Sequence, residues 1–215
     1  MNAREEILGR ARQALGDVTV ADPATDVPVT RPAPATGPAT PAQVDLFAER
    51  VADYRAVVER PTVLTAADAV LAAVTGASSG TRRILVPPGF PDALVPVDDR
   101  VEIIRDGPTV TTAELDTCDG VLSTAAIGIA ETGTIVLDHG EGQGRRAATL
   151  VPDLHVCVVR VDQVVAGVPE AVAALDPSRP QTWISGPSAT SDIELDRVEG
   201  VHGPRTLHVL LVGPA

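Results

Sequence analysis

The chain has 215 residues, of which 44% are hydrophobic and 21% are charged, a composition typical of a globular protein with one sizeable core. Its net charge of −12 argues against nucleic acid as a partner, because a polyphosphate would be repelled and no basic stripe offsets the repulsion. No apolar run reaches the roughly 18 residues that cross a bilayer, and the charged N-terminus lacks the apolar stretch of a secretory signal. We therefore expect a cytoplasmic protein without membrane insertion.

The N-terminal part is predicted to contain a helix and a linker. Apolar residues recur at helical spacing between residues 7 and 15, and Gly16 follows as a stop, which predicts a helix within residues 1–16. Prolines interrupt residues 17–41, which indicates a linker or an extended arm, since proline removes backbone donors. Residues 42–215 are then expected to form the main domain.

Two helices are predicted at the start of this domain. Apolar residues from Val44 to Val58 mark one face of the first helix, which Pro61 ends. Thr65 is expected to cap a second helix over residues 66–74, which Gly76 closes.

Apolar segments then alternate with helical ones, which predicts an α/β fold. Strands are expected at residues 83–86, 101–104, 119–123, 127–130, 134–138, 154–160, 182–185 and 207–212, and helices at 111–115 and 168–175. Such alternation favours a mostly parallel sheet with helices on both faces. The strands at 127–130 and 134–138 are close enough to form an antiparallel hairpin, with Gly133 at a positive φ angle.

The hairpin carries the first candidate site. Glu131 lies beside the hydroxyls of Thr132 and Thr134, and such a carboxylate can accept a proton or anchor a substrate. We take Glu131 as a candidate catalytic residue, and Thr132, Gly133 and Thr134 as candidate substrate-binding residues. A solvated hairpin tip has the same composition, so both interpretations stay open.

A glycine-rich segment, residues 140–146, forms the second candidate. Its backbone N–H groups, with Arg145 or Arg146, are suited to hold an anion, and Arg145 is our candidate substrate-binding residue. The spacing is not the GxGxxG of dinucleotide-binding proteins. An ordinary loop explains the segment equally well.

Residues 185–194 form the third candidate, predicted as a strand end, a tight turn and a short capped helix. Ligands of open α/β sheets bind where such strands end. The candidate substrate-binding residues are Ser185, Gly186, Ser188, Asp192 and Glu194. Ordinary capping accounts for the same residue types.

His202 and Gly203 form the last candidate, in a glycine-containing turn before the final strand. His202 is a tentative catalytic residue because imidazole titrates near neutral pH, and Gly203 is a candidate for substrate binding. No two histidines have the close spacing of a zinc site, so no metal site is expected. Cys118 and Cys157 are too few for an iron–sulfur cluster, which usually takes four thiolates.

Three segments in order, GIAETGTIVL, SGPSATSDIE and GVHGPRTLHVLLV, resemble the lactate utilization protein C (YkgG-type) branch of the LUD-domain family. The resemblance covers residue 42 to the C-terminus, and the N-terminal helix is similar to the start of those proteins. It implies a fold like that of the NagB/RpiA/CoA-transferase group. It also implies a role in oxidising L-lactate to pyruvate beside a cysteine-rich subunit and an iron–sulfur subunit.

Three functions follow as hypotheses. Lactate oxidation releases two electrons, and because this chain offers no redox-cofactor motif, the first hypothesis is an accessory subunit whose partner carries the iron–sulfur clusters. The second is a stand-alone acyl- or CoA-transfer enzyme with Glu131 as nucleophile or base. The third is a sensor that binds a small carboxylate. The residues do not decide the oligomeric state, and a homo-oligomer stays open.

Overall fold

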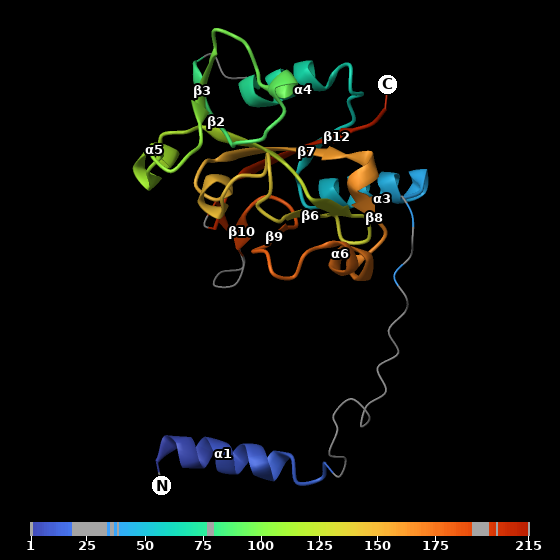
Figure 1. The fold of residues 1–215 in the computed structure, drawn as a ribbon, viewed down its shortest axis with the longest axis vertical. Coiled ribbons are helices and arrows are strands. Elements are labelled where there is room, and N and C mark those ends of the chain that lie inside the picture. Colours follow the sequence, from blue (N-terminus) through green and yellow to red (C-terminus); the bar gives the residue numbers. More distant parts are fainter. Residues whose placement is uncertain are drawn as a thin grey trace. The chain divides into compact units, whose positions relative to one another are not determined.

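The structure is a computed structural model that describes residues 2–18, 34, 37, 39–76, 80–190, 198–200 and 202–214. The chain divides into two compact units, residues 1–33 and 34–215 (Figure 1). Among the helices in these described ranges, none is both long and apolar enough to cross a membrane.

The first unit contains helix α1 (Ala3–Ala14), which confirms the predicted N-terminal helix. Asn2 and Glu5 form a reciprocal capping box at its start, which satisfies two backbone donors. No residue of α1 is buried, and the side chains of Ile7 and Leu15 are 66% and 62% exposed. Most of the proline-containing segment, predicted to be a linker, lies outside the described residues.

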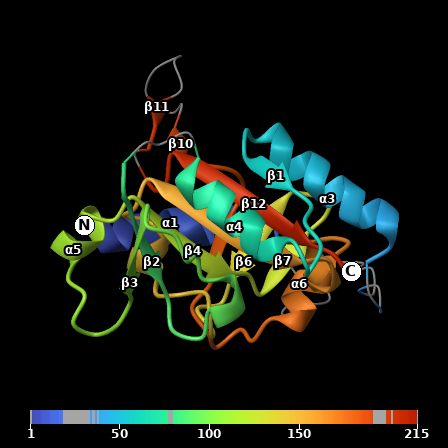
Figure 2. The same cartoon turned by 90° about the horizontal axis from the view of Figure 1, so that it is seen from above.

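A six-stranded sheet, called the main sheet here, forms the centre of the second unit (Figure 2). All its neighbouring strands are parallel, as predicted. In spatial order the strands are β1 (Val57–Glu59), β12 (Thr206–Val212), β7 (Leu154–Arg160), β4 (Gly120–Thr124), β2 (Arg82–Val86) and β3 (Val101–Arg105).

A second, mixed sheet has four strands, in the order β8 (Val164–Val165), β5 (Ile127–Ile129), β6 (Thr134–Leu137) and β9 (Thr182–Ile184). Strands β5 and β6 form the predicted antiparallel hairpin, and Gly133 has the expected positive φ of 60°. Strand β9 pairs antiparallel with β6, so it belongs to this sheet and not to the main sheet.

Helices cover both faces of the main sheet, as predicted. The remaining elements are α3 (Pro41–Asp53), α4 (Ala66–Thr75), α5 (Thr112–Asp116), α6 (Val168–Ala174), and the 3-10 turns η1 (Asp92–Leu94), η2 (Arg146–Thr149) and η3 (Val161–Gln163). Helix α4 packs on one face, against side chains such as Leu122 and Leu210. On the other face, α3 and the four-stranded sheet share a core that includes Phe47, Leu137 and Val209. Burial of these apolar surfaces is the main force that holds the layers together.

The local structure differs from the prediction at three places. The helix predicted to reach Val58 ends at Asp53, because Arg55 takes a positive φ of 69° and the chain then forms the short edge strand β1. Thr65 occupies the predicted N-cap position of α4, but its side chain makes no capping hydrogen bond, and its hydroxyl accepts a hydrogen bond from the Thr62 amide instead (3.1 Å). A tight turn and a short capped helix were predicted after Ser185, but Ala189–Thr190 form strand β10, which pairs with β11 (Val198–Glu199), and residues 191–194 lie outside the described residues.

Candidate functional site

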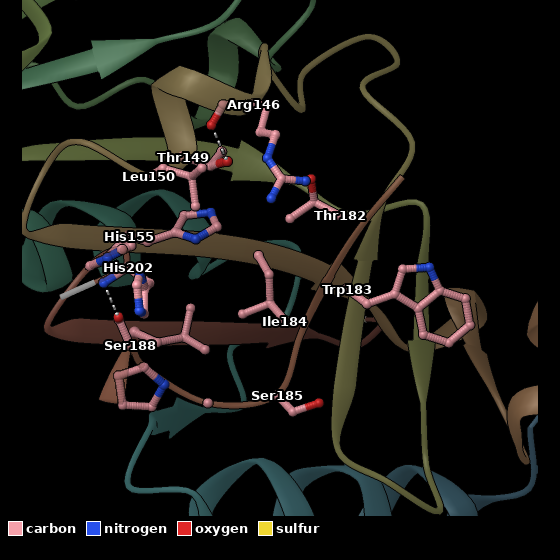
Figure 3. Close-up of a pocket in the computed structure, with 15 residues that line it drawn as sticks. Arg146, Thr149, Leu150, His155, Thr182, Trp183, Ile184, Ser185, Ser188 and His202 are labelled. Carbon is pink, nitrogen blue, oxygen red and sulfur yellow. Dashed lines mark hydrogen bonds between the residues drawn. The ribbon is translucent and has the colours of Figure 1, made fainter. Parts of the chain in front are cut away.

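A cavity of about 320 Å³ lies between the beginnings of β7 and β12 and the strand β9 (Figure 3). This volume is at the lower end of the range of small-molecule sites. Its polar lining residues come from η2, β7, β9 and the two loops that follow β9 and precede β12. They are Arg146, Thr149, His155, Thr182, Ser185, Ser188 and His202.

The cavity lies at the amino ends of two main-sheet strands. His155 and Leu207 are the second residues of β7 and β12 and stand side by side in the parallel register. Ligand sites of open parallel sheets are expected at the carboxyl ends of the strands, whereas this cavity lies at the opposite end. The reason is that β9, paired with the hairpin, delivers residues 185–188 to the opposite end of the main sheet.

The turn after β9 and the loop before β12 are joined by hydrogen bonds. The amide of Ser188 donates to the carbonyl of Pro204 (2.9 Å), and the amide of His202 donates to the Ser188 hydroxyl (3.0 Å). Gly186 has a φ of 82°, and a Cβ there would come within 2.4 Å of the Tyr54 Cβ, so the turn requires glycine. Thus Ser185, Gly186, Ser188, His202 and Gly203 all line one cavity.

The hairpin motif touches this site but does not line it. The hydroxyl of Thr134 bonds to those of Ser185 (2.8 Å) and Thr132 (2.7 Å). In Figure 3 the Ser185 hydroxyl points away from the cavity. Gly133 packs closely on α3, where a Cβ would lie 2.6 Å from the Arg50 carbonyl carbon.

Glu131 lies elsewhere. Its side chain is exposed, its amide donates to the carbonyl of Ala166 (3.0 Å), and its carboxylate lies against Gly167. The serine and histidine segments therefore line one cavity, and Glu131 lies outside it.

The glycine-rich loop sends its two arginines to different places. Arg145 binds the buried carboxylate of Asp106 through Nε (3.2 and 3.3 Å) and the carbonyl of Val110 (2.7 Å), and it lines a separate cavity of about 460 Å³. The Arg146 side chain lines the site cavity, where its guanidinium points toward Thr182 (Figure 3). Within the part of the chain that the structure describes, that guanidinium has no carboxylate partner. The sequence does not show which of the two adjacent arginines faces the cavity, because that depends on the conformation of the loop, and the prediction named Arg145.

His139 connects this loop to β9. Its Nδ1 donates to the carbonyl of Gly144 (2.8 Å), so its Nε2 is left to accept a hydrogen bond from the Thr182 hydroxyl (3.0 Å). The residue takes a positive φ of 57°, which is unusual for a histidine. These contacts fix the backbone just before Arg145 and Arg146.

His155 is the site residue that sequence reasoning missed. Its side chain is 1% exposed, its Nε2 is 2.7 Å from the Ser123 hydroxyl, and burial lowers its pKa to about 4. The imidazole is therefore neutral at physiological pH. The sequence carried one signal for it: His155 is a polar residue inside an otherwise apolar buried strand, on the same face of β7 as Cys157.

Neither cysteine is placed to bind a metal. Both are buried, burial raises the pKa of Cys118, and burial raises that of Cys157 to about 12. Among the described residues, no group of three histidine, cysteine or acidic side chains is suited to hold a metal ion. Asp192 and Glu194, the other two candidates, lie outside the described residues.

Comparisons with known proteins give a consistent result. The LUD domain family matches residues 99–212. A protein of Deinococcus radiodurans named lactate utilization protein C is 48% identical over 187 residues, which cover 85% of both chains. A Bacillus pumilus protein of the same name is 37% identical over 92 residues, covering 39% of this chain and 38% of the relative. A crystal structure of a DUF162 family protein from Deinococcus radiodurans superimposes with a TM-score of 0.66 at 39% identity, covering 82% of this chain and all of the other.

Proposed function

The chain belongs to the LUD-domain family, and from this premise we propose that it is an accessory subunit of a system that oxidises L-lactate to pyruvate. In this proposal it carries no redox cofactor, and a cysteine-rich subunit and an iron–sulfur subunit receive the electrons. A role related to lactate utilization is supported by the relatives' name. The division of labour among the subunits is our inference.

The chemistry of the sulfur atoms supports the absence of a cluster from this chain. Iron–sulfur clusters bind thiolates, whereas the raised pKa of Cys157, about 12, keeps its thiol protonated. Cys118 and Cys157 also pack in two different core clusters. Neither sulfur is available as a ligand in the folded chain, so we assign electron transfer to the partners.

We further propose that the site cavity binds a small carboxylate such as lactate or pyruvate. The observation that carries this proposal is the guanidinium of Arg146, which faces the cavity with no carboxylate partner among the described residues. Guanidinium binds carboxylates with two parallel hydrogen bonds. In a chain of net charge −12, an unpaired cation in a concave site is the feature that attracts a small anion.

Calorimetric titration of the purified chain with lactate and pyruvate tests the carboxylate site. We expect Arg146→Gln to weaken binding at least ten-fold, because one charge-assisted contact is lost. Arg105→Gln is the matched control, since Arg105 pairs with Asp92 at the surface outside the cavity and its loss should leave affinity unchanged. Equal binding by the wild type and Arg146→Gln would contradict the assignment.

Purification of the native complex tests the subunit role. Metal and flavin analysis of the separated components should find iron and any flavin on the partners and none on this chain. Lactate oxidation by the reconstituted partners should fall when this chain is omitted. Full activity without it would refute the accessory role, and carboxylate binding without any effect on oxidation would favour the sensor.

A further inference from the structure

The main sheet has a crevice at its carboxyl end that the proposed function does not use. The chain passes from β2 to β3 on one side and then places β4 on the other side of β2, so the connections reverse direction between β2 and β4 (Figure 2). Open α/β sheets bind ligands at such a point, outside the carboxyl ends of the strands. A cavity of about 460 Å³, called the carboxyl-end cavity here, is lined by residues that follow β2 and β3 and by the glycine-rich loop.

We propose that the carboxyl-end cavity binds the vicinal diol of an uncharged sugar group, such as the ribose of a nucleoside. In this assignment Asp106 accepts hydrogen bonds from the diol and Arg145 donates to it. Both residues line this cavity, and neither lines the cavity that contains Arg146. The inference therefore does not depend on the carboxylate site.

The carboxylate of Asp106 is buried and has unused acceptor capacity. Its side chain is 4% exposed, and within the described ranges Arg145 alone donates to it, through Nε at 3.2 and 3.3 Å and through Nη2 at 3.2 Å. Because an ionised carboxylate has about four acceptor positions, some are left for the hydroxyl groups of a ligand. In doubly wound sheets, an acidic residue about 20 residues beyond the first strand hydrogen-bonds a ribose hydroxyl, and Asp106 has this place directly after β3.

Arg145 supplies the complementary donors. Its Nε and Nη2 are held by Asp106 and by the carbonyl of Val110 (2.7 Å), whereas its Nη1 has no acceptor among the residues that the structure describes. The side chain is 43% exposed, so this end of the guanidinium is open to a ligand. A hydroxyl group both donates and accepts. Two adjacent hydroxyl groups can therefore donate to the carboxylate and accept from the guanidinium at the same time.

The glycine-rich loop forms a fixed wall of backbone, which lets a ligand come close. The amide of Gly142 donates to the carbonyl of Pro88 (2.8 Å), and the amide of Thr124 donates to the carbonyl of Gly142 (2.8 Å). The loop is thus held between the ends of β2 and β4. Gly89 has a φ of 77°, and a Cβ there would lie 2.7 Å from the Cβ of Glu141, so this approach requires glycine.

The charges around the cavity favour an uncharged ligand. Asp106 and Arg145 neutralise each other, Glu141 is exposed at the cavity, and the whole chain has a net charge of −12. A phosphate therefore meets no net positive charge here. The connection from β2 to β3 contains only the three-residue turn η1 as a helical element, so it offers no long helix whose N-terminus could hold the pyrophosphate of a dinucleotide.

Calorimetric titration of the full chain with adenosine and with 2′,3′-dideoxyadenosine tests the role of the diol. Adenosine should bind at least about ten-fold more tightly, because the dideoxy analogue supplies no hydroxyl groups to the buried carboxylate. Free ribose distinguishes two sources of the same chemistry. If ribose binds as well, the site recognises the sugar alone, and if only adenosine binds, it recognises a nucleoside.

Substitutions test the assigned residues. Asp106→Asn keeps the size of the side chain but replaces an acceptor oxygen by an amide, and it should weaken adenosine binding at least about ten-fold. Asp92→Asn is the matched control, since Asp92 pairs with Arg105 at the surface outside the cavity, and it should bind as the wild type does. If Asp106→Asn does not fold, Arg145→Gln keeps the carboxylate and removes Nη1, and it should weaken binding at least about three-fold.

Several results would overturn the inference. One is that neither adenosine nor ribose binds, and another is that adenosine and its dideoxy analogue bind equally. Unchanged affinity in folded Asp106→Asn, or in Arg145→Gln where it takes the place of that variant, would remove the assigned residues. Tighter binding of AMP than of adenosine would indicate a phosphate site and refute the uncharged class.

Discussion

At the scale of single residues, neighbours in sequence have opposite roles. Arg145 and Arg146 are adjacent and chemically identical, yet one neutralises a buried carboxylate and the other faces a cavity. Their backbones differ, because Arg145 is extended and Arg146 is the first residue of the turn η2. Their substitutions should therefore have different effects.

We expect Arg145→Gln to lower the free energy of unfolding by about 1–3 kcal/mol, because the buried Asp106 carboxylate loses its charged partner. Arg146→Gln should change it by less than about 0.5 kcal/mol, as at an ordinary surface position. Urea denaturation followed by circular dichroism measures both values. Equal losses in the two variants would show that Arg146 also has a structural role.

His155 should make stability depend on pH. Burial lowers its pKa from 6.5 to about 4, so between these values the unfolded chain binds a proton that the folded chain does not. The free energy of unfolding should thus fall as pH decreases from about 6.5 to about 4, by up to about 3 kcal/mol. The comparison of wild type with His155→Gln at pH 7 and pH 5 isolates this contribution, and identical pH dependence would contradict it.

At the scale of elements, the hairpin β5–β6 acts as a connector between α3 and the site. Gly133 lets its turn approach α3, and Thr134 bonds to Ser185 at the beginning of the cavity loop. This approach depends on the backbone of the turn, which needs a positive φ and no side chain at Gly133. The position of β9, and with it one wall of the cavity, depends on this hairpin.

Gly133→Ala should consequently destabilise the protein by more than about 2 kcal/mol, since it combines left-handed backbone strain with overlap against Arg50 and Val51. Gly107→Ala is the matched control: a Cβ there meets no atom within 4 Å, and the backbone is not left-handed. Thermal unfolding of the two variants gives the comparison. A Gly133→Ala protein as stable as the control would mean that the hairpin can move away from α3.

At the scale of the whole molecule, the burial of the two cysteines shows how tightly the layers of the fold pack. Cys157 is sealed between the main sheet and the four-stranded sheet, and Cys118 is sealed under α5. Both thiols have raised pKa values because of burial, with Cys157 at about 12. Neither should react with reagents while the layers stay packed.

When the native protein is treated with an aromatic disulfide reagent at pH 8, its two cysteines should therefore hardly react. Both cysteines should react once the protein is denatured. The rate of the slow native reaction should rise with urea in parallel with the equilibrium fraction of unfolded protein. Rapid modification of Cys157 in the native state would contradict the close packing of the two sheets around it.

The sequence by itself determined the α/β class, the parallel strands and the hairpin at Gly133, because hydrophobic periodicity and glycine at a positive φ are local properties. It also indicated the segments at residues 185–188 and 202–204. The tertiary structure decided that β9 leaves the main sheet, that Glu131 lies outside the cavity, and that Arg146 and His155 lie inside it. Strand pairing and side-chain direction depend on contacts between residues far apart in the chain, and a single sequence pattern does not encode which of two adjacent arginines turns inward.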